Sequence, residues 1–380
     1  NNIILRTHQT NLPLVCCHFF SLFLLFKCTI KFGMSHSKFM NKCIELAQRG
    51  LGNTYPNPLV GSVVVSNNKV IGSGWHQKAG EAHAEVNAIR SVQDTRALPT
   101  STLYVNLEPC SHHGKTPPCT DLIIQSGIRH VVVGMLDPFE KVNGQGVEKL
   151  RNAGIKVDIG VEEESCKTLN KRFLTAINNK RPYVILKWAK TKDGYIAPKN
   201  KTNNQPVWIS NSISRTLAHQ WRAEEQSILI GSQTALDDNP ALTTRRVDGP
   251  SPTRILIDPN EKIERNAKLF AADQKVIVYT KNHSRVDEHV NYVSVDFSGN
   301  GLEQILKDLF HKNIQSVLVE GGAKTLQCFI DAGMWDEAKI FTGQGTFGDG
   351  ILAPDTSSFT NAPASIAELD GDVLEVWVNH

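Results

Sequence analysis

The chain has 380 residues, enough for about two domains, and hydrophobic residues make up 40% of it. This fraction supports buried cores but is too small for a protein with many membrane spans. The 41 Lys and Arg residues nearly balance the 38 Asp and Glu residues, and no basic block occurs. The charge pattern disfavours a dedicated nucleic-acid binder and favours chemistry on small molecules.

The cysteines indicate a reducing compartment. There are eight of them, scattered along a long chain rather than concentrated in a short one. That pattern differs from a disulfide-stapled secreted domain. We therefore expect a cytoplasmic protein whose thiols are free or bind metal.

The first 33 residues differ from the rest. They begin at Asn1 and include an apolar run at 12–26, which is short for a spanning helix and lacks a small-residue cleavage site after it. From Met34 the sequence becomes polar and helix-like. We expect residues 1–33 to be upstream sequence, with Met34 or Met40 as the true start, although a genuine export or anchor segment is the alternative.

The first half of the remaining chain alternates between helical and strand patterns. We predict helices at 38–50, from 83 to 90, at 119–126 and at 144–153, and strands at 59–65, 70–75, 101–107, 129–135 and 155–160. The strands at 59–65 and 70–75 flank a probable hairpin turn. A polar helical stretch at 162–182 is predicted to join two domains.

A second series of elements begins after Pro182. Strands are predicted at 183–189, 227–231, 254–258, 275–280, 316–320 and near 336–342, and helices at 211–224, 301–312 and 323–332. Such alternation implies sheets covered by helices. We find no internal repeat.

The stretches "GEAHAEVNAIR" (80–90) and "NLEPCSHHGKTPPCT" (106–120) contain a possible metal site. His83, Cys110 and Cys119 offer one nitrogen and two sulfurs, and a catalytic zinc uses three protein ligands with water in the fourth position. Glu85 lies at the N-terminus of the predicted helix, and from there it can take a proton from the metal-bound water and pass it to a leaving amine. The signature H-x-E…P-C-x-x-C marks zinc nucleobase deaminases, but here the second cysteine follows nine residues after the first.

Two alternatives stay open for this cluster. His83, Cys110 and Glu85 could be ordinary structural residues, although H-x-E and P-C occurring together favour a metal site. His112 or His113 could replace Cys119 as a ligand, but thiolate suits zinc and Cys119 sits at a predicted helix start.

Three motifs resemble the deaminase half of the bifunctional riboflavin-biosynthesis deaminase–reductases: "YPNPLVGSVVV", "GWHQKAGEAHAEVNAI" and "LEPCSHHGKTPPCTDLII". The long cysteine spacing is that family's own variant. The resemblance runs from about residue 37 to near the C-terminus. It implies that His83, Cys110 and Cys119 bind zinc and Glu85 shuttles protons. It also implies that Asn57 and His76 hold the pyrimidine or its ribose phosphate.

Two glycine motifs are candidate phosphate sites. Gly343, Gly345 and Gly348 form a G-x-G-x-x-G, but no helix is predicted after it, so we expect a loop near a subunit or substrate edge. The stretch 316–330 is a better candidate, since a buried strand ends at Glu320 and Gly321-Gly322 opens a helix whose N–H groups could bind phosphate. A plain tight turn explains that stretch equally well.

The stretches "LKWAKTKDGYIA", "WISN" and "GSQTALDDNPALTTR" resemble the reductase half of the same family, which is similar to dihydrofolate reductase in fold and reduces ribosyl to ribityl with NADPH. The resemblance implies NADPH contacts from Ala189, Trp208, Thr234, Asp238, Gly322, Ala323, Lys324, Thr325, Leu326, Gln327 and Cys328. It implies substrate contacts from Arg222, Leu242, Arg245 and Glu320, with Lys187 and Asp193 as further polar anchors.

The arginines also make physical sense, because a guanidinium grips a sugar phosphate through two nitrogens, although each could be a solvated surface charge. The sequence departs from the family at Pro206 and Pro259, where serine is common. Both departures put individual side-chain contacts in doubt.

These observations predict an α/β protein of two domains. Residues 35–180 would form a cytidine-deaminase-like α/β/α domain, and residues 181–380 a dihydrofolate-reductase-like α/β domain. The expected function is zinc-dependent deamination followed by NADPH-dependent reduction of a phosphoribosylaminopyrimidine, in a homo-oligomer without nucleic-acid or membrane partners. A nucleic-acid base deaminase with an accessory domain, or a structural zinc module on a degenerate reductase fold, are the alternatives.

Overall fold

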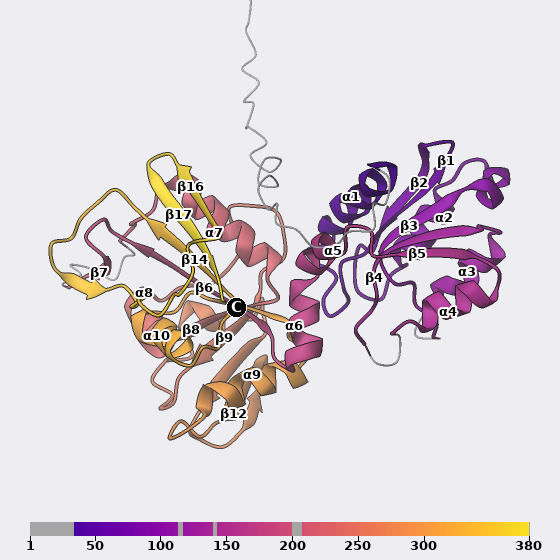
Figure 1. The fold of residues 1–380 in the computed structure, drawn as a ribbon. Helices are drawn as coiled ribbons and strands as arrows, with labels where there is room; N and C mark the ends of the chain where they lie inside the picture. Colours follow the sequence, from indigo (N-terminus) through magenta and orange to yellow (C-terminus); the bar gives the residue numbers. More distant parts are fainter. Residues whose placement is uncertain (1–33, 113–116, 140–142, 200–206, 380) are drawn as a thin grey trace, which may run out of the picture.

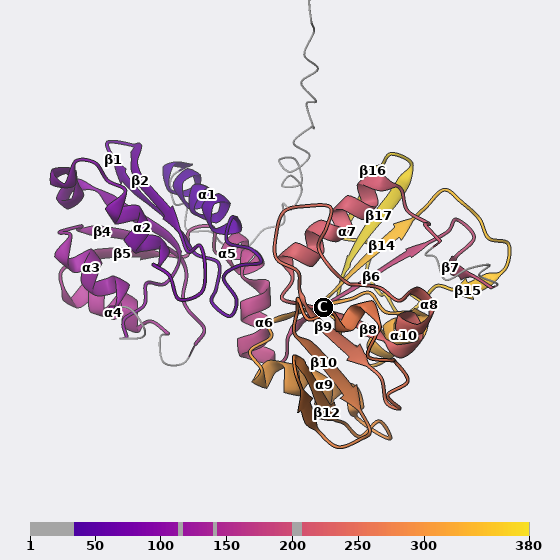
Figure 2. The ribbon, with the colours of Figure 1, turned by 180° about the vertical axis from the view of Figure 1, so that it is seen from behind.

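A computed structural model describes residues 34–112, 117–139, 143–199 and 207–379 of the chain. Its helices and strands form two lobes that lie side by side, with helix α6 between them (Figures 1 and 2). Three expectations concern residues outside these ranges: the origin of 1–33, His113 as a ligand, and the effect of Pro206. None of the described helices has the length and apolar character that a membrane crossing requires.

The first lobe contains a five-stranded sheet in the order β2-β1-β3-β4-β5. Its strands are β1 (Gly61–Ser66), β2 (Lys69–Trp75), β3 (Thr102–Leu107), β4 (His130–Met135) and β5 (Lys156–Ile159). β2, β1 and β3 are antiparallel, whereas β3, β4 and β5 are parallel. Successive residues of a strand point to opposite faces, and here both faces carry buried apolar side chains.

Helices cover both faces of this sheet. α2 (Ala84–Arg90), α3 (Cys119–Gln125) and α4 (Gln145–Asn152) share one core with Val64 and Val105. α1 (Met34–Gln48) and α5 (Glu163–Leu169) share the other with Val63 and Tyr104, and a short 3-10 helix (Thr95–Thr100) precedes β3. The lobe is therefore the expected α/β/α sandwich.

The second lobe contains a ten-stranded sheet in the order β11-β12-β10-β9-β8-β13-β6-β14-β17-β16. The strands from β12 to β14 in this order are parallel, and the outer strands β11, β17 and β16 are antiparallel. The carboxyl ends of the parallel strands meet at one edge, which is where ligands bind in open sheets of this kind.

The strands of this sheet are β6 (Tyr183–Lys190), β8 (Ser227–Gly231), β9 (Thr253–Ile257), β10 (Val276–Thr280), β11 (Arg285–Asp287), β12 (Val290–Ser294), β13 (Ser316–Val319), β14 (Glu337–Thr342), β16 (Ser365–Leu369) and β17 (Asp372–Val378). β7 (Tyr195–Pro198) and β15 (Gly350–Leu352) form a separate antiparallel pair.

Four helices cover the large sheet. α7 (Ser212–Glu224) and α8 (Ser232–Asp238) pack on one face, and α9 (Gly301–His311) and α10 (Ala323–Asp331) pack on the other. A 3-10 helix (Lys268–Phe270) completes the side that α8 covers.

The predicted strands and helices are confirmed with shifts of a few residues at their ends, except that the helix predicted at 38–50 begins at Met34. The sequence patterns did not predict α8, β7, β11, β12, β15, β16 and β17. Most of these strands are short or half-exposed, so they lack the continuous apolar runs of the central strands.

The stretch at 162–182 is two helices rather than one: α5 ends at Leu169, and α6 (Lys171–Asn179) follows. The break lies at the buried Asn170, whose side-chain oxygen accepts the Leu59 N–H at 2.8 Å and whose side-chain nitrogen donates to the Leu59 carbonyl at 3.0 Å. The Asn170 side chain thus satisfies both backbone groups of Leu59, as a neighbouring strand would. The chain turns at Asn170 towards the second lobe.

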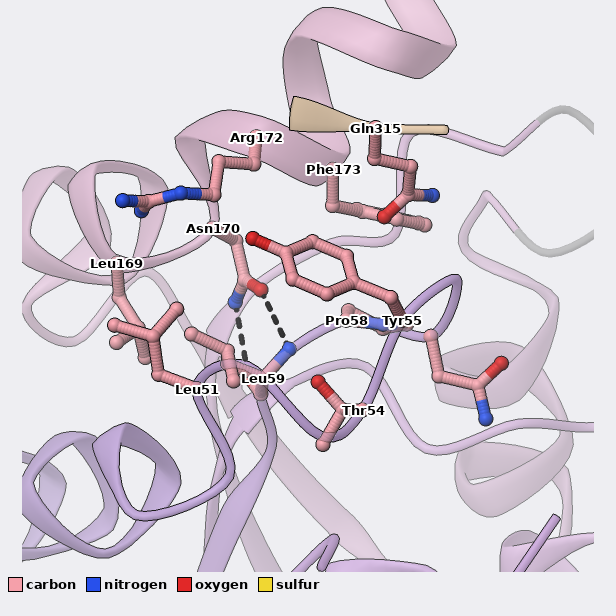
Figure 3. A pocket seen from close by; sticks show the side chains of 11 residues that line it. Leu51, Thr54, Tyr55, Pro58, Leu59, Leu169, Asn170, Arg172, Phe173 and Gln315 are labelled. Carbon is pink, nitrogen blue, oxygen red and sulfur yellow. Dashed lines mark hydrogen bonds between the residues drawn. The ribbon is translucent and has the colours of Figure 1, made fainter. Parts of the chain in front are cut away.

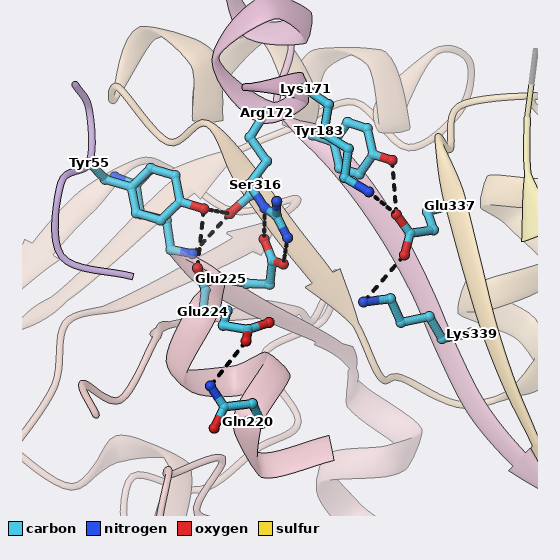
Figure 4. Close-up of polar contacts among 11 residues, drawn as sticks. Tyr55, Lys171, Arg172, Tyr183, Gln220, Glu224, Glu225, Ser316, Glu337 and Lys339 are labelled. Atoms are coloured by element: carbon cyan, nitrogen blue, oxygen red, sulfur yellow. Dashed lines mark hydrogen bonds and ion pairs between the residues drawn. The ribbon is translucent and has the colours of Figure 1, made fainter. Parts of the chain in front are cut away.

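A buried ion pair joins α6 to the second lobe. The Arg172 guanidinium donates through two nitrogens to the Glu225 carboxylate, and the side chains of Arg172 and Glu225 are 12% and 0% exposed (Figure 4). Burial alone would raise the pKa of Glu225, but the Arg172 charge outweighs burial and lowers it. The pair therefore stays charged at neutral pH.

We expect Arg172→Met to lower the free energy of unfolding by about 3–5 kcal/mol, because it leaves the Glu225 carboxylate buried without a partner. Urea denaturation of the variant measures this loss. The double variant Arg172→Met/Glu225→Met should recover much of the stability, since it removes both charges. A single variant as stable as the wild-type protein would contradict the assignment.

Candidate functional site

The first candidate site begins at the N-terminus of α2. His83 precedes the helix with an extended backbone, and its carbonyl accepts the Asn87 N–H at 3.1 Å. The His83 ring makes no capping hydrogen bond to the helix. The ring is therefore available to face the loop that carries the two cysteines.

The N-terminus of α3 orients both cysteines. Cys119 is the first helical residue, and its backbone N–H donates to the Cys110 sulfur at 3.3 Å. The backbone and hydroxyl of Thr120 both donate to the Cys110 carbonyl at 3.2 Å. The first N–H groups of a helix have no partner within it, so here they fix Cys110 and favour its thiolate.

The three side chains converge on one point. The His83 Nδ1 atom lies 3.6 Å from the Cys110 sulfur and 3.3 Å from the Cys119 sulfur. Their ligand atoms all lie within 4.8 Å of one another. Tetrahedral zinc with Zn–N of about 2.0 Å and Zn–S of about 2.3 Å places nitrogen and sulfur about 3.5 Å apart. The donor set therefore fits zinc in both type and spacing.

The thiols interact strongly. The Cys119 thiol lowers the pKa of Cys110, and His83 adds to this effect. The same thiol–thiol contact, with burial, raises the pKa of Cys119. A cation bound by both sulfurs would stabilise both as thiolates, which is what a zinc site provides.

Glu85 lies in the first turn of α2, buried beside these ligands, and is 3% exposed. Burial raises the pKa of Glu85 to about 7, and the neighbouring Cys110 adds to the increase. A carboxyl group with a pKa near neutrality can both accept and release a proton at working pH. The predicted position of Glu85 at the helix N-terminus is confirmed.

Asn57 and His76 form a polar pair next to the metal ligands. The His76 ring lies edge-on to the His83 ring, with 5.5 Å between centroids. Burial lowers the pKa of His76, which indicates a neutral ring. Its Nδ1 lies 3.2 Å from the Ala82 carbonyl, which can only accept, so Nε2 accepts from the Asn57 side-chain nitrogen at 3.0 Å.

Glu108, a residue that the sequence did not predict, supports the loop that carries Cys110. Its buried carboxylate accepts four backbone N–H groups, from Asp137, Gly144, Gly146 and Val147 at 2.8–3.2 Å. Glu108 thus holds the N-terminus of α4 beside Pro109 and Cys110. A charged residue at the end of a buried strand was the available signal.

His112, the competing ligand that the structure describes, does not join the cluster. His112 is exposed and lies outside the group of convergent metal-binding side chains found among the described residues. Cys119 is nearly fully buried and faces His83. The geometry therefore favours Cys119 over His112.

The second candidate site lies where β8 and β13 end. The Gly322 N–H donates to the Thr234 hydroxyl at 2.7 Å, which ties the start of α10 to α8. A side chain at Gly321 would lie 2.7 Å from the backbone of Gly231. The two strand-to-helix turns therefore touch backbone to backbone, and the Gly321-Gly322 turn is the predicted helix start.

Glu320 is at the centre of this site. Arg222 donates through Nε and Nη2 to its two carboxylate oxygens, each at 2.8 Å, and Lys187 Nζ lies 3.6 Å away. A third Arg222 nitrogen donates to the Thr243 carbonyl at 3.3 Å. The edge of Arg222 that we expected to grip a phosphate therefore faces Glu320. A substrate contact by Arg222 stays a prediction.

His219 was also missed, one helical turn before Arg222. Burial, together with the charges of Arg222 and Arg245, lowers the pKa of His219 to about 4, so the ring is neutral. Its Nδ1 accepts the Arg245 backbone N–H at 3.3 Å. Arg245 itself is largely exposed, and partial desolvation of its guanidinium, together with repulsion from Arg222 and Arg246, lowers its pKa. These arginines form a positively charged cluster.

The other residues expected to contact the cofactor or substrate occupy varied environments. Trp208 is exposed and lies under the Arg215 guanidinium, and Lys324 and Cys328 are exposed on α10. Leu326 and Leu242 are buried in cores, so only their backbones could reach a ligand. The remaining residues are half-buried: Ala189, Asp238, Ala323, Thr325 and Gln327.

Asp193 fixes the loop that carries Gly343, Gly345 and Gly348. Its carboxylate accepts the Phe347 N–H at 3.0 Å and the Gly348 N–H at 2.7 Å. No described helix follows this loop, so it lacks the helix N-terminus that a dinucleotide-binding turn requires. Asp193 holds a loop here, and its role as a substrate anchor stays a prediction.

Comparison with known proteins agrees with both sites. Residues 34–135 match the family model of the cytidine and deoxycytidylate deaminase zinc-binding region, and residues 182–374 match that of the RibD C-terminal domain. The riboflavin biosynthesis protein RibD of Aquifex aeolicus is 42% identical over 83% of this chain and 89% of its own length. The chain belongs to the bifunctional riboflavin-biosynthesis deaminase–reductase family.

Solved structures support the same family. A diaminohydroxyphosphoribosylaminopyrimidine deaminase/5-amino-6-(5-phosphoribosylamino)uracil reductase from Thermotoga maritima has a TM-score of 0.81 at 38% identity and covers 91% of this chain and 99% of its own. Acinetobacter baumannii RibD has a TM-score of 0.82 at 32% identity with the same coverage. The first lobe is thus the deaminase half, the second is the reductase half, and a nucleic-acid base deaminase is not favoured.

The reductase half should show a pH dependence that comes from Glu320. Burial alone would raise its pKa, but Arg222 and Lys187 outweigh burial and hold the pKa at about 2, below the ordinary 4.5. Because the folded pKa is the lower one, the stabilisation is complete above 4.5 and is lost as the pH falls towards 2.

Between about pH 6 and about pH 3, the free energy of unfolding should fall less in Glu320→Gln than in the wild-type protein, because glutamine does not titrate. Urea denaturation at a series of pH values measures this difference. Parallel pH profiles for the two proteins would contradict this expectation.

Proposed function

We propose that the protein catalyses two successive steps of riboflavin biosynthesis. The first is the hydrolytic removal of the 2-amino group of 2,5-diamino-6-(5-phosphoribosylamino)pyrimidin-4-one. The second is the NADPH-dependent reduction of the ribosyl group to ribityl. The observation that carries the first step is the convergence of His83, Cys110 and Cys119 beside the buried Glu85.

His83, Cys110 and Cys119 would hold zinc in the deaminase half. When bound, zinc lowers the pKa of a coordinated water towards neutrality and so supplies the nucleophile for hydrolysis. Glu85 accepts a proton at its carboxylate and later gives it to the departing amine, so that one water enters and one ammonia leaves. The buried position of Glu85 keeps bulk water from competing for this proton.

Asn57 and His76 would hold the substrate ring beside these groups. The His76 ring is neutral and already accepts from Asn57, so the pair offers fixed dipoles rather than charge. A neutral pair suits an uncharged pyrimidine, whose ring nitrogens and exocyclic groups make hydrogen bonds.

The reductase half would bind NADPH where β8 and β13 end. The proposed cofactor contacts are Ala189, Trp208, Thr234, Asp238 and the run from Gly322 to Cys328. The hydrogen bond between Gly322 and Thr234 supports this site. It holds the turns after β8 and β13 together, so that their backbone N–H groups can lie close to a ligand. NADPH supplies hydride when bound.

The substrate would lie beside Glu320. Lys187, Arg222 and Glu320 present a fixed array of donors and acceptors that suits sugar hydroxyls, and backbone groups at Leu242 complete it. Arg245 extends this array towards solvent. Arg222 and Arg246 repel the charge of Arg245 and so help to lower its pKa. A bound phosphate would relieve this repulsion.

We further propose a boundary near residue 180, a homo-oligomeric state and a cytoplasmic location. The gap between the two family matches, 136–181, supports the boundary. The free thiols of Cys43, Cys166 and Cys328 support a reducing compartment. Size measurement of the purified protein would test the oligomeric state.

The test is a paired assay on the purified chain loaded with zinc. The diaminopyrimidine ribosyl phosphate is supplied, and ammonia release and NADPH oxidation are followed separately. Ammonia release followed by NADPH oxidation is the expected result. Ammonia without oxidation would contradict the reductase assignment, where Pro259 departs from the family. The absence of both signals would contradict the substrate.

A further inference from the structure

The loop between α1 and β1, residues 49–60, connects the deaminase site to the reductase half. On the deaminase side, the Asn57 side chain donates to His76, and a side chain at Gly50 would lie 2.6 Å from the His76 carbonyl. The loop thus supplies Asn57 and contacts His76, the two residues that we propose to hold the pyrimidine.

The Tyr55 side chain reaches in the opposite direction, into the reductase half. Its hydroxyl lies 3.2 Å from the Glu224 carbonyl at the end of α7 and 3.1 Å from the Ser316 hydroxyl at the start of β13 (Figure 4). The Ser316 hydroxyl also accepts the Gln226 N–H at 2.9 Å. Since that N–H only donates and the Glu224 carbonyl only accepts, Ser316 donates to Tyr55 and Tyr55 donates to Glu224.

Two further contacts dock the same loop on the reductase half. The Gln315 side chain donates to the Pro56 carbonyl at 2.8 Å. A side chain at Gly52 would lie 2.2 Å from the Ala223 carbonyl, so only glycine permits this approach. Within the described residues, every hydrogen bond of Tyr55 and Pro56 goes to the reductase half.

The crevice around Tyr55 is too small for a ligand. It lies between the loop, Asn170, Arg172 and Gln315 (Figure 3), and its volume is about 10 Å³. That is room for one water molecule at most. The interface is therefore packed, and its function is to fix the loop rather than to bind a small molecule.

A hydrogen bond within the loop and Asn170 of the deaminase half hold the loop at other points. The Asn57 N–H donates to the Thr54 carbonyl at 2.8 Å, and Asn170 binds both backbone groups of Leu59. Tyr55 and Pro56 lie between these anchors. The turn immediately before Asn57 is thus closed by its own hydrogen bond, and its outward hydrogen bonds go to the reductase half, so docking of that half helps to set the position of the Asn57 side chain.

We propose that Tyr55 is a positioning residue for the deamination reaction, through which the reductase half fixes Asn57 against His76. The precise position of Asn57 in the deaminase site then depends on docking of the reductase half on the loop. This inference rests on the proposed function, and specifically on Asn57 as a substrate contact.

The test is Tyr55→Phe in the full zinc-loaded chain. The ring remains and only the hydroxyl is lost, so the interface stays filled. We expect the KM for the diaminopyrimidine substrate to rise about five- to tenfold, the scale of one hydrogen bond, with kcat changed much less. Zinc content and NADPH oxidation on the deaminated substrate should not change.

Ser316→Ala tests the same bond from the reductase side. Ser316 lies four residues before Glu320, about 13 Å along the strand, so the reduction step should be spared. We expect a similar rise in KM for deamination, and a Tyr55→Phe/Ser316→Ala double variant no worse than the poorer single variant. Should Tyr55→Phe fail to fold, Ser316→Ala alone decides.

Tyr183→Phe is the matched control. Its hydroxyl donates to Glu337 at 3.0 Å in the neighbouring polar cluster and not, among the described residues, to the 49–60 loop. An unchanged KM in Tyr55→Phe and Ser316→Ala, or an equal rise in Tyr183→Phe, would overturn the inference. A wild-type chain that releases no ammonia would instead overturn the proposed function.

Discussion

Glu85→Gln is expected to lower ammonia release by about 10²- to 10⁴-fold, the range that a positioned acid–base group contributes. Glutamine has nearly the same shape as glutamate and still makes hydrogen bonds, but it cannot carry a proton at working pH. Because Glu85 is 3% exposed, water has little access to replace it. Ammonia release from the purified variant measures the loss.

The variant should keep its zinc, since His83, Cys110 and Cys119 remain. It should also oxidise NADPH at the wild-type rate when given the deaminated substrate. Glu81→Gln is the matched control, because Glu81 lies four residues before Glu85 but is exposed. Ammonia release within about tenfold of the wild-type rate would show that Glu85 is not the proton carrier.

The sequence predicted the central elements because burial leaves a strong pattern. Strands such as β8 and β13 are covered on both faces, and their continuous apolar runs mark them. β16 and β11 lie at the edges of the sheet, where half-exposed or exposed residues leave no such run. Their existence depends on partners that the local sequence does not specify.

The deaminase site was predictable because its residues lie close together in sequence. His83 and Glu85 share one helix start, and Cys110 and Cys119 bracket one loop. The contact between Arg222 and Glu320 spans 98 residues, and that between Tyr55 and Ser316 spans 261. No spacing rule reaches so far, so the orientation of Arg222 and the role of the 49–60 loop needed the structure.

Glu108 shows a second limit on what the sequence can predict, namely the role of a residue whose position is already evident. Its position next to Pro109-Cys110 was visible, but four backbone N–H groups from 137–147 make it structural. A buried carboxylate without partners would be costly, and these bonds remove that cost. Only the fold shows that the loop and the start of α4 meet at this side chain.

Arg222→Ala is expected to lower kcat/KM of the reduction step by at least about thirtyfold, corresponding to about 2 kcal/mol for the loss of one partner of a buried charge pair. Glu320 would lose both 2.8 Å contacts and keep only Lys187 at 3.6 Å. NADPH oxidation with the deaminated substrate measures this loss, and ammonia release should not change.

The pH profile separates an electrostatic role for Arg222 from simple loss of packing. Since the Arg222 charge lowers the pKa of Glu320, its removal raises that pKa and moves the acid limb of the reduction rate to higher pH. Arg222→Lys keeps a charge but not the two-nitrogen contact, so its acid limb should shift less than that of Arg222→Ala. Arg265→Ala, which removes an exposed arginine beside Asp287 and Glu288, should leave the profile unchanged. An acid limb that does not move in Arg222→Ala would mean that the guanidinium supports the site only by filling space.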